Sequence, residues 1–356
     1  MRLSNLVTLS LMGVASAAPA HHQHIAKRDA VTTTVQNQVT VTEGANGLLQ
    51  EDAVVASTTA TAAGATVAVA AAAGTTSTLE PSAAAASTSN SGAAPSSSVA
   101  SGSAKGITYS PYASDGTCKS ASDVASDLAQ LTSYGIIRLY GVDCSQVENV
   151  LKAKTSSQKL FLGIYYVDQI ADGVSSIKSA IESYGSWDDV YTVSVGNELV
   201  NSGSATTAQV GEYISTAKSA LTAAGYTGPV VSVDTFIAVI NNPDLCNYSD
   251  YMGVNAHAYF DENTAAENAG PWVLEQIQRV WTACGGKKDV LITESGWPSQ
   301  GQTYGVAVPS KANQKAAISS IEDTCGSATI LFTAFNDYWK ADGAYGVEKY
   351  FGILSN

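Results

Sequence analysis

The 356-residue sequence is poor in charge, and this limits the partners that it can bind. Only 14% of its residues are charged, against about 25% in an average globular protein. The 31 acidic residues outnumber the 18 lysines and arginines, which gives a net charge of −13. A protein of this sign repels phosphate groups, so we expect neither nucleic acid nor an anionic membrane as a partner. The composition suits a neutral substrate.

The sequence also lacks the patterns of metal, nucleotide and membrane proteins. None of its five cysteines has the spacing of a metal site, and no glycine-rich nucleotide loop follows the first expected strand. We therefore expect no metal and no cofactor. After the N-terminal leader, no segment is apolar over the roughly 20 residues that cross a bilayer, and the C-terminus has no hydrophobic tail for a lipid anchor.

The first 28 residues predict a leader for secretion. A basic start, a short apolar stretch and an A-x-A cleavage site indicate a signal peptide over residues 1–17. The alternative, a membrane anchor, is disfavoured because the apolar stretch is too short. A Lys-Arg pair then predicts a propeptide over residues 18–28, although an incidental basic pair is the alternative.

The next segment, residues 29–105, lacks the material for a core. Between residues 53 and 104 there is a single charged residue, Glu80, and no aromatic residue. Such a segment buries too little apolar surface to offset the loss of chain entropy on folding. Secreted stretches rich in Ser and Thr are commonly O-glycosylated. We expect a disordered, O-mannosylated spacer rich in Ser, Thr and Ala, with a plain flexible linker as the alternative.

From residue 106 onward, short apolar runs alternate with amphipathic stretches. The expected strands are 107–110, 136–140, 160–165, 190–195, 230–233, 252–255, 290–293 and 330–335, and the expected helices are 120–133, 144–154, 174–184, 207–224, 271–284 and 310–324. Eight strands alternating with helices over residues 106–356 predict an α/β fold, the (β/α)8 or TIM barrel. The rival is an open, doubly wound sheet.

Two of the apolar runs end on a glutamate. VGNELV delivers Glu198 after the fourth expected strand, and ITESGWP delivers Glu294 after the seventh. Because the carboxyl ends of barrel strands surround one pocket, we expect these side chains to meet there. Glycosidic cleavage uses such a pair: one acid protonates the leaving oxygen, and the other carboxylate attacks the sugar or activates water. The alternative is that both are solvated surface residues.

The runs around the two glutamates resemble glycoside hydrolase family 17, the β-1,3-glucanases. NELVNSG and ITESGWPSQG are similar to the family's signature runs, and residues 106–354 resemble the yeast cell-wall mannoproteins of that family. The resemblance implies a secreted enzyme that acts on cell-wall β-1,3-glucan by a retaining mechanism, with Glu198 as acid/base and Glu294 as nucleophile. Hydrolysis is the expected outcome, and transglycosylation or a structural, adhesive wall role stay open as alternatives.

Neighbouring polar residues are expected to support the two carboxylates. Asn197 is expected to bind the sugar 2-OH, a contact that tightens in the transition state; its alternative role is to cap a turn. Arg138 and Tyr140 end the second strand, and we expect them to orient or neutralise the carboxylates. His257 and Tyr259 follow the sixth strand. Tyr259 is preferred as the hydrogen-bond donor to the nucleophile, and a core histidine is the alternative reading of His257.

Aromatic faces recognise sugars by stacking on their C–H surfaces. The expected sugar-contacting aromatics share a place in or just past strand ends: Tyr109, Tyr112, Tyr165, Tyr166, Trp297 and Trp339. Core packing is the alternative for each, and it is the expectation for Trp187, Trp272 and Trp281. In the run FNDYWKADG, which resembles an acidic-plus-lysine loop of the family, Lys340 is expected to contact substrate, whereas Asp337 is given no catalytic role.

Five cysteines in a secreted protein predict two disulfides and one remaining thiol. We expect Cys118 to pair with Cys144 and Cys284 with Cys325, since the members of each pair flank neighbouring strands. Cys246 would then be free or bonded to a wall component, and the alternative is that all five are buried thiols. A covalent or disulfide link to the wall is therefore expected.

One N-glycosylation sequon is present, at Asn247, in the loop before the sixth expected strand. A surface loop in a secreted protein is compatible with this modification. An unoccupied sequon is the alternative.

Overall fold

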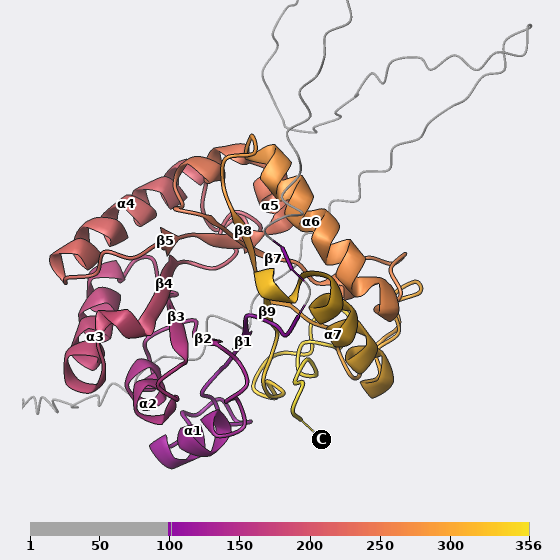
Figure 1. Ribbon diagram of the computed structural model, residues 1–356, viewed down its shortest axis with the longest axis horizontal. Coiled ribbons are helices and arrows are strands. Elements are labelled where there is room, and N and C mark those ends of the chain that lie inside the picture. Colours follow the sequence, from indigo (N-terminus) through magenta and orange to yellow (C-terminus); the bar gives the residue numbers. More distant parts are fainter. Residues whose placement is uncertain (1–98, 101, 356) are drawn as a thin grey trace, which may run out of the picture. The chain divides into compact units, whose positions relative to one another are not determined.

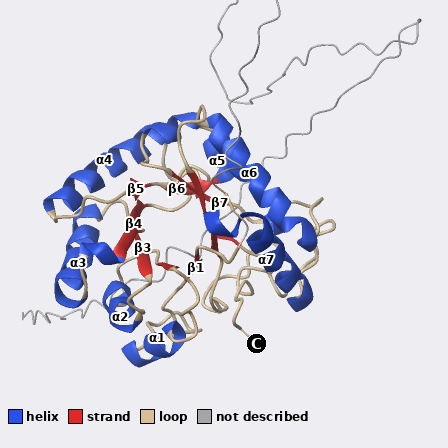
Figure 2. Cartoon of the chain, in the orientation of Figure 1, coloured by secondary structure: helices blue, strands red, loops and turns tan. Residues whose placement is uncertain are grey.

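The computed structural model describes residues 99–100 and 102–355. The expected signal peptide, the propeptide and most of the spacer lie outside this range, so they stay predictions. Within it, strands and helices alternate, with the strands at the centre and the helices around them (Figures 1 and 2). None of the described helices is both long and apolar enough to cross a membrane.

The elements follow the predicted order closely. The strands are β1 (Gly106–Thr108), β2 (Ile136–Arg138), β3 (Lys159–Ile164), β4 (Val190–Val195), β5 (Val230–Val231), β6 (Val233–Thr235), β7 (Met252–Asn255), β8 (Val290–Ser295) and β9 (Thr329–Leu331). The helices are α1 (Ala121–Leu128), α2 (Gln146–Ala153), α3 (Ile170–Tyr184), α4 (Thr207–Ala223), α5 (Phe236–Asn241), α6 (Ala269–Ala283) and α7 (Lys311–Cys325). Every predicted strand and helix is present, and the short α5 was not predicted.

The strands form one parallel sheet in the order β5-β4-β3-β2-β1-β9-β8-β7-β6. The two ends of this order, β5 and β6, are separated in sequence only by Ser232, so they are two halves of the fifth barrel strand. The first half pairs with β4 and the second half pairs with β7. The backbone N–H of Ser232 leaves the ladder and donates to Ser249 Oγ at 2.8 Å. The ring of eight strands closes through this interruption, which confirms the barrel and excludes the open sheet.

Alternation along the strands separates the barrel interior from the layer under the helices. Inward side chains form one small cluster: Ile136, Phe161, Val231, Val233, Leu291 and Ile330. Their neighbours Ile137 and Ile292 belong instead to the larger cluster beneath the helices. Successive strand residues face opposite sides, so the face that buries Ile136 also carries Arg138 and Tyr140 toward the carboxyl end. The apolar interior thus supports the polar site above it.

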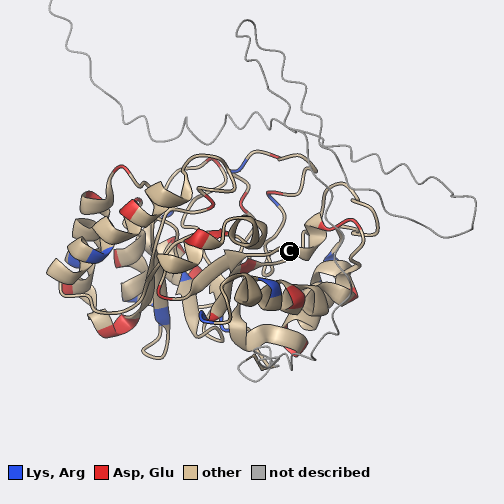
Figure 3. Cartoon of the chain, turned by 90° about the horizontal axis from the view of Figure 1, so that it is seen from above, with Lys and Arg blue, Asp and Glu red and all other residues tan. Residues whose placement is uncertain are grey.

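Four of the seven α-helices in the described part of the chain begin at a residue whose side chain caps the first turn: α1, α4, α5 and α7. At α1, Ser120 accepts the backbone N–H of Asp123, and the Asp123 carboxylate accepts the N–H of Ser120 in return. Such a capping box satisfies two backbone donors that the first turn leaves unpaired. The charged residues are spread over helices and loops (Figure 3).

The disulfides differ from the prediction. Cys118 pairs with Cys144 as expected, but Cys284 pairs with Cys246. Cys284 caps the end of α6 and meets the short 3-10 helix over Pro243–Asn247, whereas Cys325 closes α7 as a fully buried thiol whose pKa burial raises to about 11. The prediction of a Cys284–Cys325 bridge is wrong, and so is that of a Cys246 free for a wall component.

The folded unit starts before residue 106. The N–H of Gly102 donates to the carbonyl of Glu322 in α7 at 3.0 Å, and that of Lys105 donates to Thr329 at 2.9 Å. Ala104 is 5% exposed. These residues, which the sequence analysis assigned to the spacer, pack against the barrel.

Two of the three tryptophans expected in the core, Trp187 and Trp272, are partly buried and pack against it: the Trp187 ring lies 5.2 Å from Tyr226, and the Trp272 ring lies 5.4 Å from Phe236. Trp281 is partly buried in α6, beside Gly286, and core packing stays a prediction for it. Asn247 is exposed at the end of its 3-10 helix, and occupancy of the sequon stays a prediction.

Candidate active site

The two expected carboxylates lie at the same end of the barrel. Glu294 lies near the end of β8, and Glu198 lies in the turn that follows β4. With β5 and β6 counted as one strand, these are the seventh and fourth strands of the barrel. Both positions are at carboxyl ends, where barrel enzymes build their active sites.

The turn after β4 has an unusual backbone. Gly196 has φ +71°, and a Cβ there would lie 2.4 Å from Leu199 Cδ1, so only glycine fits. Glu198 itself has φ +53°, a left-handed conformation that few residues other than glycine adopt. Its N–H donates to the carbonyl of Val233 at 2.8 Å, which ties the turn to the fifth strand.

A β-bulge directs Glu294 to the inside of the barrel. Val254 pairs with Ile292, but the next residue, Asn255, pairs with Glu294, so β8 carries one extra residue at Thr293. Ile292 faces the helices, and strict alternation would place Glu294 on that same outer face. The extra residue reverses the alternation, so the Glu294 side chain faces the barrel interior. Bulges that re-aim a side chain are common beside active sites.

Inside the barrel, Glu294 is surrounded by donors. Arg138 Nη1 lies 2.8 Å from Oε1 and forms a salt bridge with it, although Arg138 is 1% exposed and Glu294 only 6%. The hydroxyl of Tyr140 donates to the same oxygen at 2.9 Å, and His257 Nε2 lies 3.3 Å from Oε2. Arg138 and Tyr140 therefore lie where the sequence placed them, against a carboxylate.

Asn255 connects the two carboxylates. Its Nδ2 donates to Glu198 Oε1 at 2.9 Å, and its Oδ1 accepts from Thr293 Oγ1 at 2.8 Å and from Arg138 Nη1 at 3.4 Å. Arg138 Nη2 donates to Asn197 Oδ1 at 3.0 Å. The second, fourth, sixth and seventh strands thus share one hydrogen-bond network with a glutamate at each end.

The surroundings shift the two glutamate pKa values in opposite directions. Burial raises the pKa of Glu198, and the negative charge of Glu294 raises it further, against the hydrogen bond from Asn255. Burial would also raise the pKa of Glu294, but the charge of Arg138 and the contact with His257 outweigh it and lower this pKa to about 2. Two carboxyl groups whose environments separate their pKa values are suited to acid and nucleophile roles.

The contact at the sixth strand differs from the prediction. His257, and not Tyr259, lies against Glu294. The hydroxyl of Tyr259 donates to the carbonyl of Gln302, and its ring packs 5.7 Å from Trp297. The preference for Tyr259 is wrong because the backbone turns into a 3-10 helix at Ala258, which carries Tyr259 away from the pocket.

The expected aromatic residues divide into exposed and buried groups. Tyr165 and Tyr166 are 37% and 46% exposed after β3. Trp339 is partly exposed and lies 4.9 Å from Tyr112. By contrast, Tyr109 and Trp297 are fully buried, with their polar atoms donating to Asp127 and to the carbonyl of Val308 respectively. A fully buried ring has no face for a sugar, so these two predictions are wrong and the core alternative holds.

Lys340 lies close to the site but already has a partner. Its Nζ is 2.8 Å from Asp337 Oδ2 and 4.7 Å from the centre of the Phe332 ring. Its positive charge contributes to the low pKa of Glu294. Contact with substrate stays a prediction for Lys340.

The sequence analysis missed Asn255, and it preferred Tyr259 to His257 as the partner of Glu294. Asn255 ends the strand MGVN, where a polar side chain closes a buried apolar run. That is the signal that selected Arg138, and it was present here too. The choice between His257 and Tyr259 had no such signal, because it depends on the 3-10 turn at Ala258 and on the bulge in β8.

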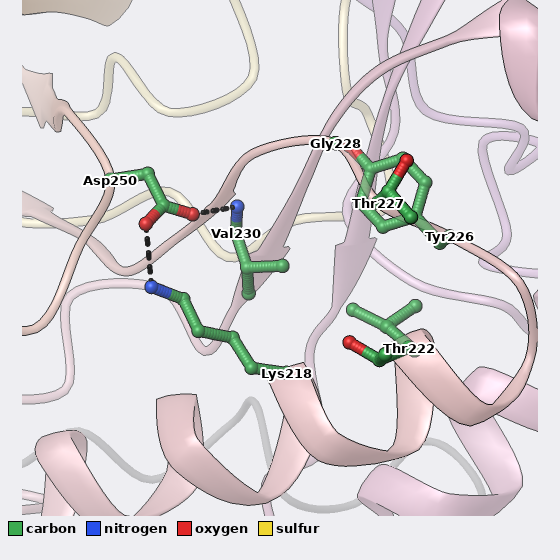
Figure 4. Close-up of a pocket in the computed structure, with 8 residues that line it drawn as sticks. Lys218, Thr222, Tyr226, Thr227, Gly228, Val230 and Asp250 are labelled. Carbon is green, nitrogen blue, oxygen red and sulfur yellow. Dashed lines mark hydrogen bonds and ion pairs between the residues drawn. The ribbon is translucent and has the colours of Figure 1, made fainter.

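A cavity of about 150 Å³ lies at the opposite end of the fifth strand, next to Val230, the first residue of β5 (Figure 4). Asp250 accepts the N–H of Val230 at 2.7 Å and pairs with Lys218 at 2.6 Å. The cavity is therefore at the amino ends of the strands, away from the two glutamates. In residues 102–355 no group of histidine, cysteine, aspartate and glutamate has the arrangement of a metal site.

The comparisons with known proteins agree with this geometry. A family model described as "BtgE/BtgC glycoside hydrolase domain" matches residues 106–352. "Probable family 17 glucosidase SCW10" of Saccharomyces cerevisiae is 65% identical over an alignment of 389 residues that covers all of both chains. "Cell surface mannoprotein MP65" of Candida albicans is 70% identical over 258 residues, 72% of this chain and 68% of that one.

Solved structures show the same fold. A glycoside hydrolase family 17 β-1,3-glucanosyltransferase from Rhizomucor miehei aligns with a TM-score of 0.60 and 23% identity, over 71% of this chain and 93% of that one. Barrel and site together define a class, that of the barrel glycosidases with carboxylates on strands four and seven. Within this class, the chain belongs to glycoside hydrolase family 17, as the sequence runs around Glu198 and Glu294 indicated.

Proposed function

We propose that this protein is a β-1,3-glucan-active enzyme of the cell wall with a retaining mechanism. One observation carries the proposal: a hydrogen-bond network joins Glu198 and Glu294, yet the two pKa values move apart. Glycosidases of either stereochemistry need one protonated and one ionised carboxyl group around one bond. Retention is proposed from membership of family 17. The proposed substrate is supported by the low charge of the chain and by the solved Rhizomucor miehei relative, whose complex holds laminaritriose.

In the first step, Glu294 attacks the anomeric carbon while the glycosidic C–O bond breaks. The leaving oxygen takes its proton from Glu198. Arg138 and Tyr140 both bind Oε1 of Glu294, whereas within the described part of the chain Oε2 has only the longer contact with His257. We therefore assign the attack to Oε2. Asn197, fixed through Arg138, is placed to bind the sugar 2-OH.

In the second step, Glu198 acts as a base. It is ionised because it has given its proton to the leaving oxygen, and once Glu294 is a neutral ester its charge no longer raises the pKa of Glu198. It then takes a proton from the incoming hydroxyl while that oxygen displaces Glu294 from the sugar. Water gives hydrolysis and a sugar hydroxyl of another glucan chain gives transglycosylation, since both share the same intermediate.

Defined laminari-oligosaccharides test the proposal, with Glu294→Gln as the control. We expect the unmodified protein to give shorter products, and mass spectrometry of any longer products to measure transglycosylation. Glu294→Gln should give neither. Equal products from both proteins, or none from either, would contradict catalysis.

A structural wall protein is the second candidate. It is supported by the name of the Candida albicans relative, a cell surface mannoprotein, and by the expected Ser/Thr-rich spacer. We place the protein in the wall under either function. Because both disulfides are internal and Cys325 is buried, a reducing agent should not release it from isolated walls, whereas glucan digestion should. Release by the reducing agent alone would contradict this attachment.

A further inference from the structure

Asp234 is a buried carboxylate that the mechanism above does not use. It lies in β6, the second half of the fifth barrel strand, and is 3% exposed. Its Oδ2 accepts the backbone N–H of Val200 at 2.8 Å, and its Oδ1 accepts those of Asn201 at 3.1 Å and Thr235 at 2.9 Å. Two of these three donors belong to the turn that carries Glu198.

That turn holds Glu198 in an unfavourable conformation. A left-handed backbone is unfavourable for a residue other than glycine, so surrounding contacts must maintain it. The N–H of Glu198 itself donates to the carbonyl of Val233. After Glu198, the N–H groups of Val200 and Asn201 donate to the carboxylate of Asp234. The fifth strand therefore clamps the turn on both sides of Glu198.

We propose that Asp234 is a positioning residue for the acid/base Glu198, an inference that rests on the proposed function. By fixing the two N–H groups that follow Glu198, Asp234 keeps the Glu198 carboxyl group against Asn255, at the end of the network that leads to Glu294. The same strand holds Asn255 in register, because Thr235 pairs with Asn255 across β6 and β7. One short strand thus sets the relative position of the acid and of its hydrogen-bond donor.

The charge of Asp234 acts in the same direction. After burial and the charge of Glu294 in β8, the charge of Asp234 in β6 also raises the pKa of Glu198, whereas that of His257, after β7, lowers it. Arg138 in β2 is connected to Glu198 indirectly, through its hydrogen bonds to Asn197 and Asn255. Burial raises the pKa of Asp234 itself, and its three backbone donors oppose this by favouring the carboxylate. Removing the negative charge should therefore lower the pKa of Glu198.

Asp250 provides a matched control. It clamps the same barrel strand through the N–H of Val230 (Figure 4), at the amino end of that strand, whereas the two glutamates lie at the carboxyl end of the barrel. A change of Asp250 to asparagine tests what the loss of a strand clamp does by itself.

The experiment compares Asp234→Asn, Asp234→Ala, Asp250→Asn and Glu198→Ala in the full chain. The kcat/KM of folded protein is measured on a laminari-oligosaccharide and on a dinitrophenyl β-laminaribioside, whose leaving group needs little protonation. For Asp234→Ala we expect a loss of about 10- to 100-fold on the oligosaccharide and less than about 3-fold on the aryl substrate. For Asp234→Asn we expect a smaller loss and an alkaline limb of the pH profile that moves to lower pH. Asp250→Asn should leave the ratio between substrates unchanged.

The outcomes separate the inference from the function on which it rests. If Glu198→Ala discriminates between the substrates but neither Asp234 variant does, or if the alkaline limb does not move, the role of Asp234 is refuted and the acid role of Glu198 stands. If Glu198→Ala affects both substrates equally, the proposed function fails and the inference fails with it. Should Asp234→Ala not fold, Asp234→Asn gives both readouts by itself.

Discussion

The regions that hold Glu294 and Glu198 differ in how they fix a carboxyl group. Glu294 lies in β8 next to its bulge, and side chains set its state: a salt bridge of 2.8 Å to Arg138 and a hydroxyl of Tyr140 at 2.9 Å. Glu198 lies in a strained turn, which the fifth strand holds through the carbonyl of Val233 and the carboxylate of Asp234. The only side chain that donates to its carboxyl group among the described residues is Asn255.

This difference explains why the pKa values of two carboxyl groups in one pocket are shifted in opposite directions. A cation in a strand position stabilises the ionised form directly, so Glu294 has a low pKa. Hydrogen bonds to the fifth strand fix the turn, so Glu198 is oriented without a cation beside it. Burial and the neighbouring negative charge then outweigh the hydrogen bond from Asn255 and raise the pKa of Glu198.

The largest effects should come from removing each carboxyl group in turn. We expect Glu294→Gln to lose at least about 10⁴-fold in kcat on every substrate, because no nucleophile is left. Glu198→Ala should lose about 10²- to 10⁴-fold in kcat/KM on natural glucan and far less on an activated aryl glycoside. Steady-state kinetics on both substrates measures this. Equal losses for Glu198→Ala on the two substrates would contradict a separate acid role for the Glu198 region.

The next effect concerns the cation of the Glu294 region. Arg138 contacts both Glu294 and Asn197 with its planar fork, which a lysine cannot reproduce. We expect Arg138→Lys to lose roughly 10- to 100-fold in kcat/KM on both substrates. Because the pKa of Glu294 should rise from about 2, the acidic limb of the pH profile should move to higher pH. Lys178→Met, on an exposed helical pair, is the control and should change neither. An unmoved acidic limb would remove Arg138 from this role.

Stability should distinguish the two regions by sign. The pKa of Glu294 is lower in the folded chain, so its contribution is present above its ordinary value of 4.5 and is lost as the pH falls toward 2. The pKa of Glu198 is raised in the folded chain, so its contribution to stability is present at low pH and is lost as the pH rises through the raised pKa. At pH 7 we expect Glu294→Gln to lower Tm by about 5–10 °C and Glu198→Gln to raise it by about 2 °C.

Calorimetry at pH 7 and at pH 3 checks both signs. The gain from Glu198→Gln should shrink at the lower pH, where the native side chain is also neutral. A fall in Tm for Glu198→Gln at pH 7 would contradict the expectation that the buried Glu198 carboxyl group lowers stability at that pH.

The smallest effect should come from outside both regions. Deleting residues 29–98 should change Tm and turnover little, on the order of 1 °C, since the composition of this segment predicts no core of its own. Extending the deletion to residue 105 should cost more, because it removes buried Ala104 and the hydrogen bond of Lys105 to Thr329. Paired melting curves measure the difference. Equal Tm values for both deletions would show that residues 99–105 contribute nothing.

The sequence by itself determined the elements of the barrel and the two glutamates. These features are local: period-two runs specify strands, period-3.6 stretches specify helices, and a polar residue that closes an apolar run marks a strand end. For that reason Glu198, Glu294, Arg138 and Tyr140 could all be selected as residues of one site. The resemblance around the two glutamates indicated the family for the same reason, since it lies in short continuous runs.

Only the tertiary structure decided what meets across the barrel. The bulge at Thr293 turns Glu294 inward and gives it His257, while a 3-10 turn removes Tyr259. The end of α6 brings Cys284 to Cys246. Such contacts join segments far apart in sequence, and one extra residue in a strand reverses which face a side chain takes. No local pattern records these events, whereas packing between strands and helices fixes them.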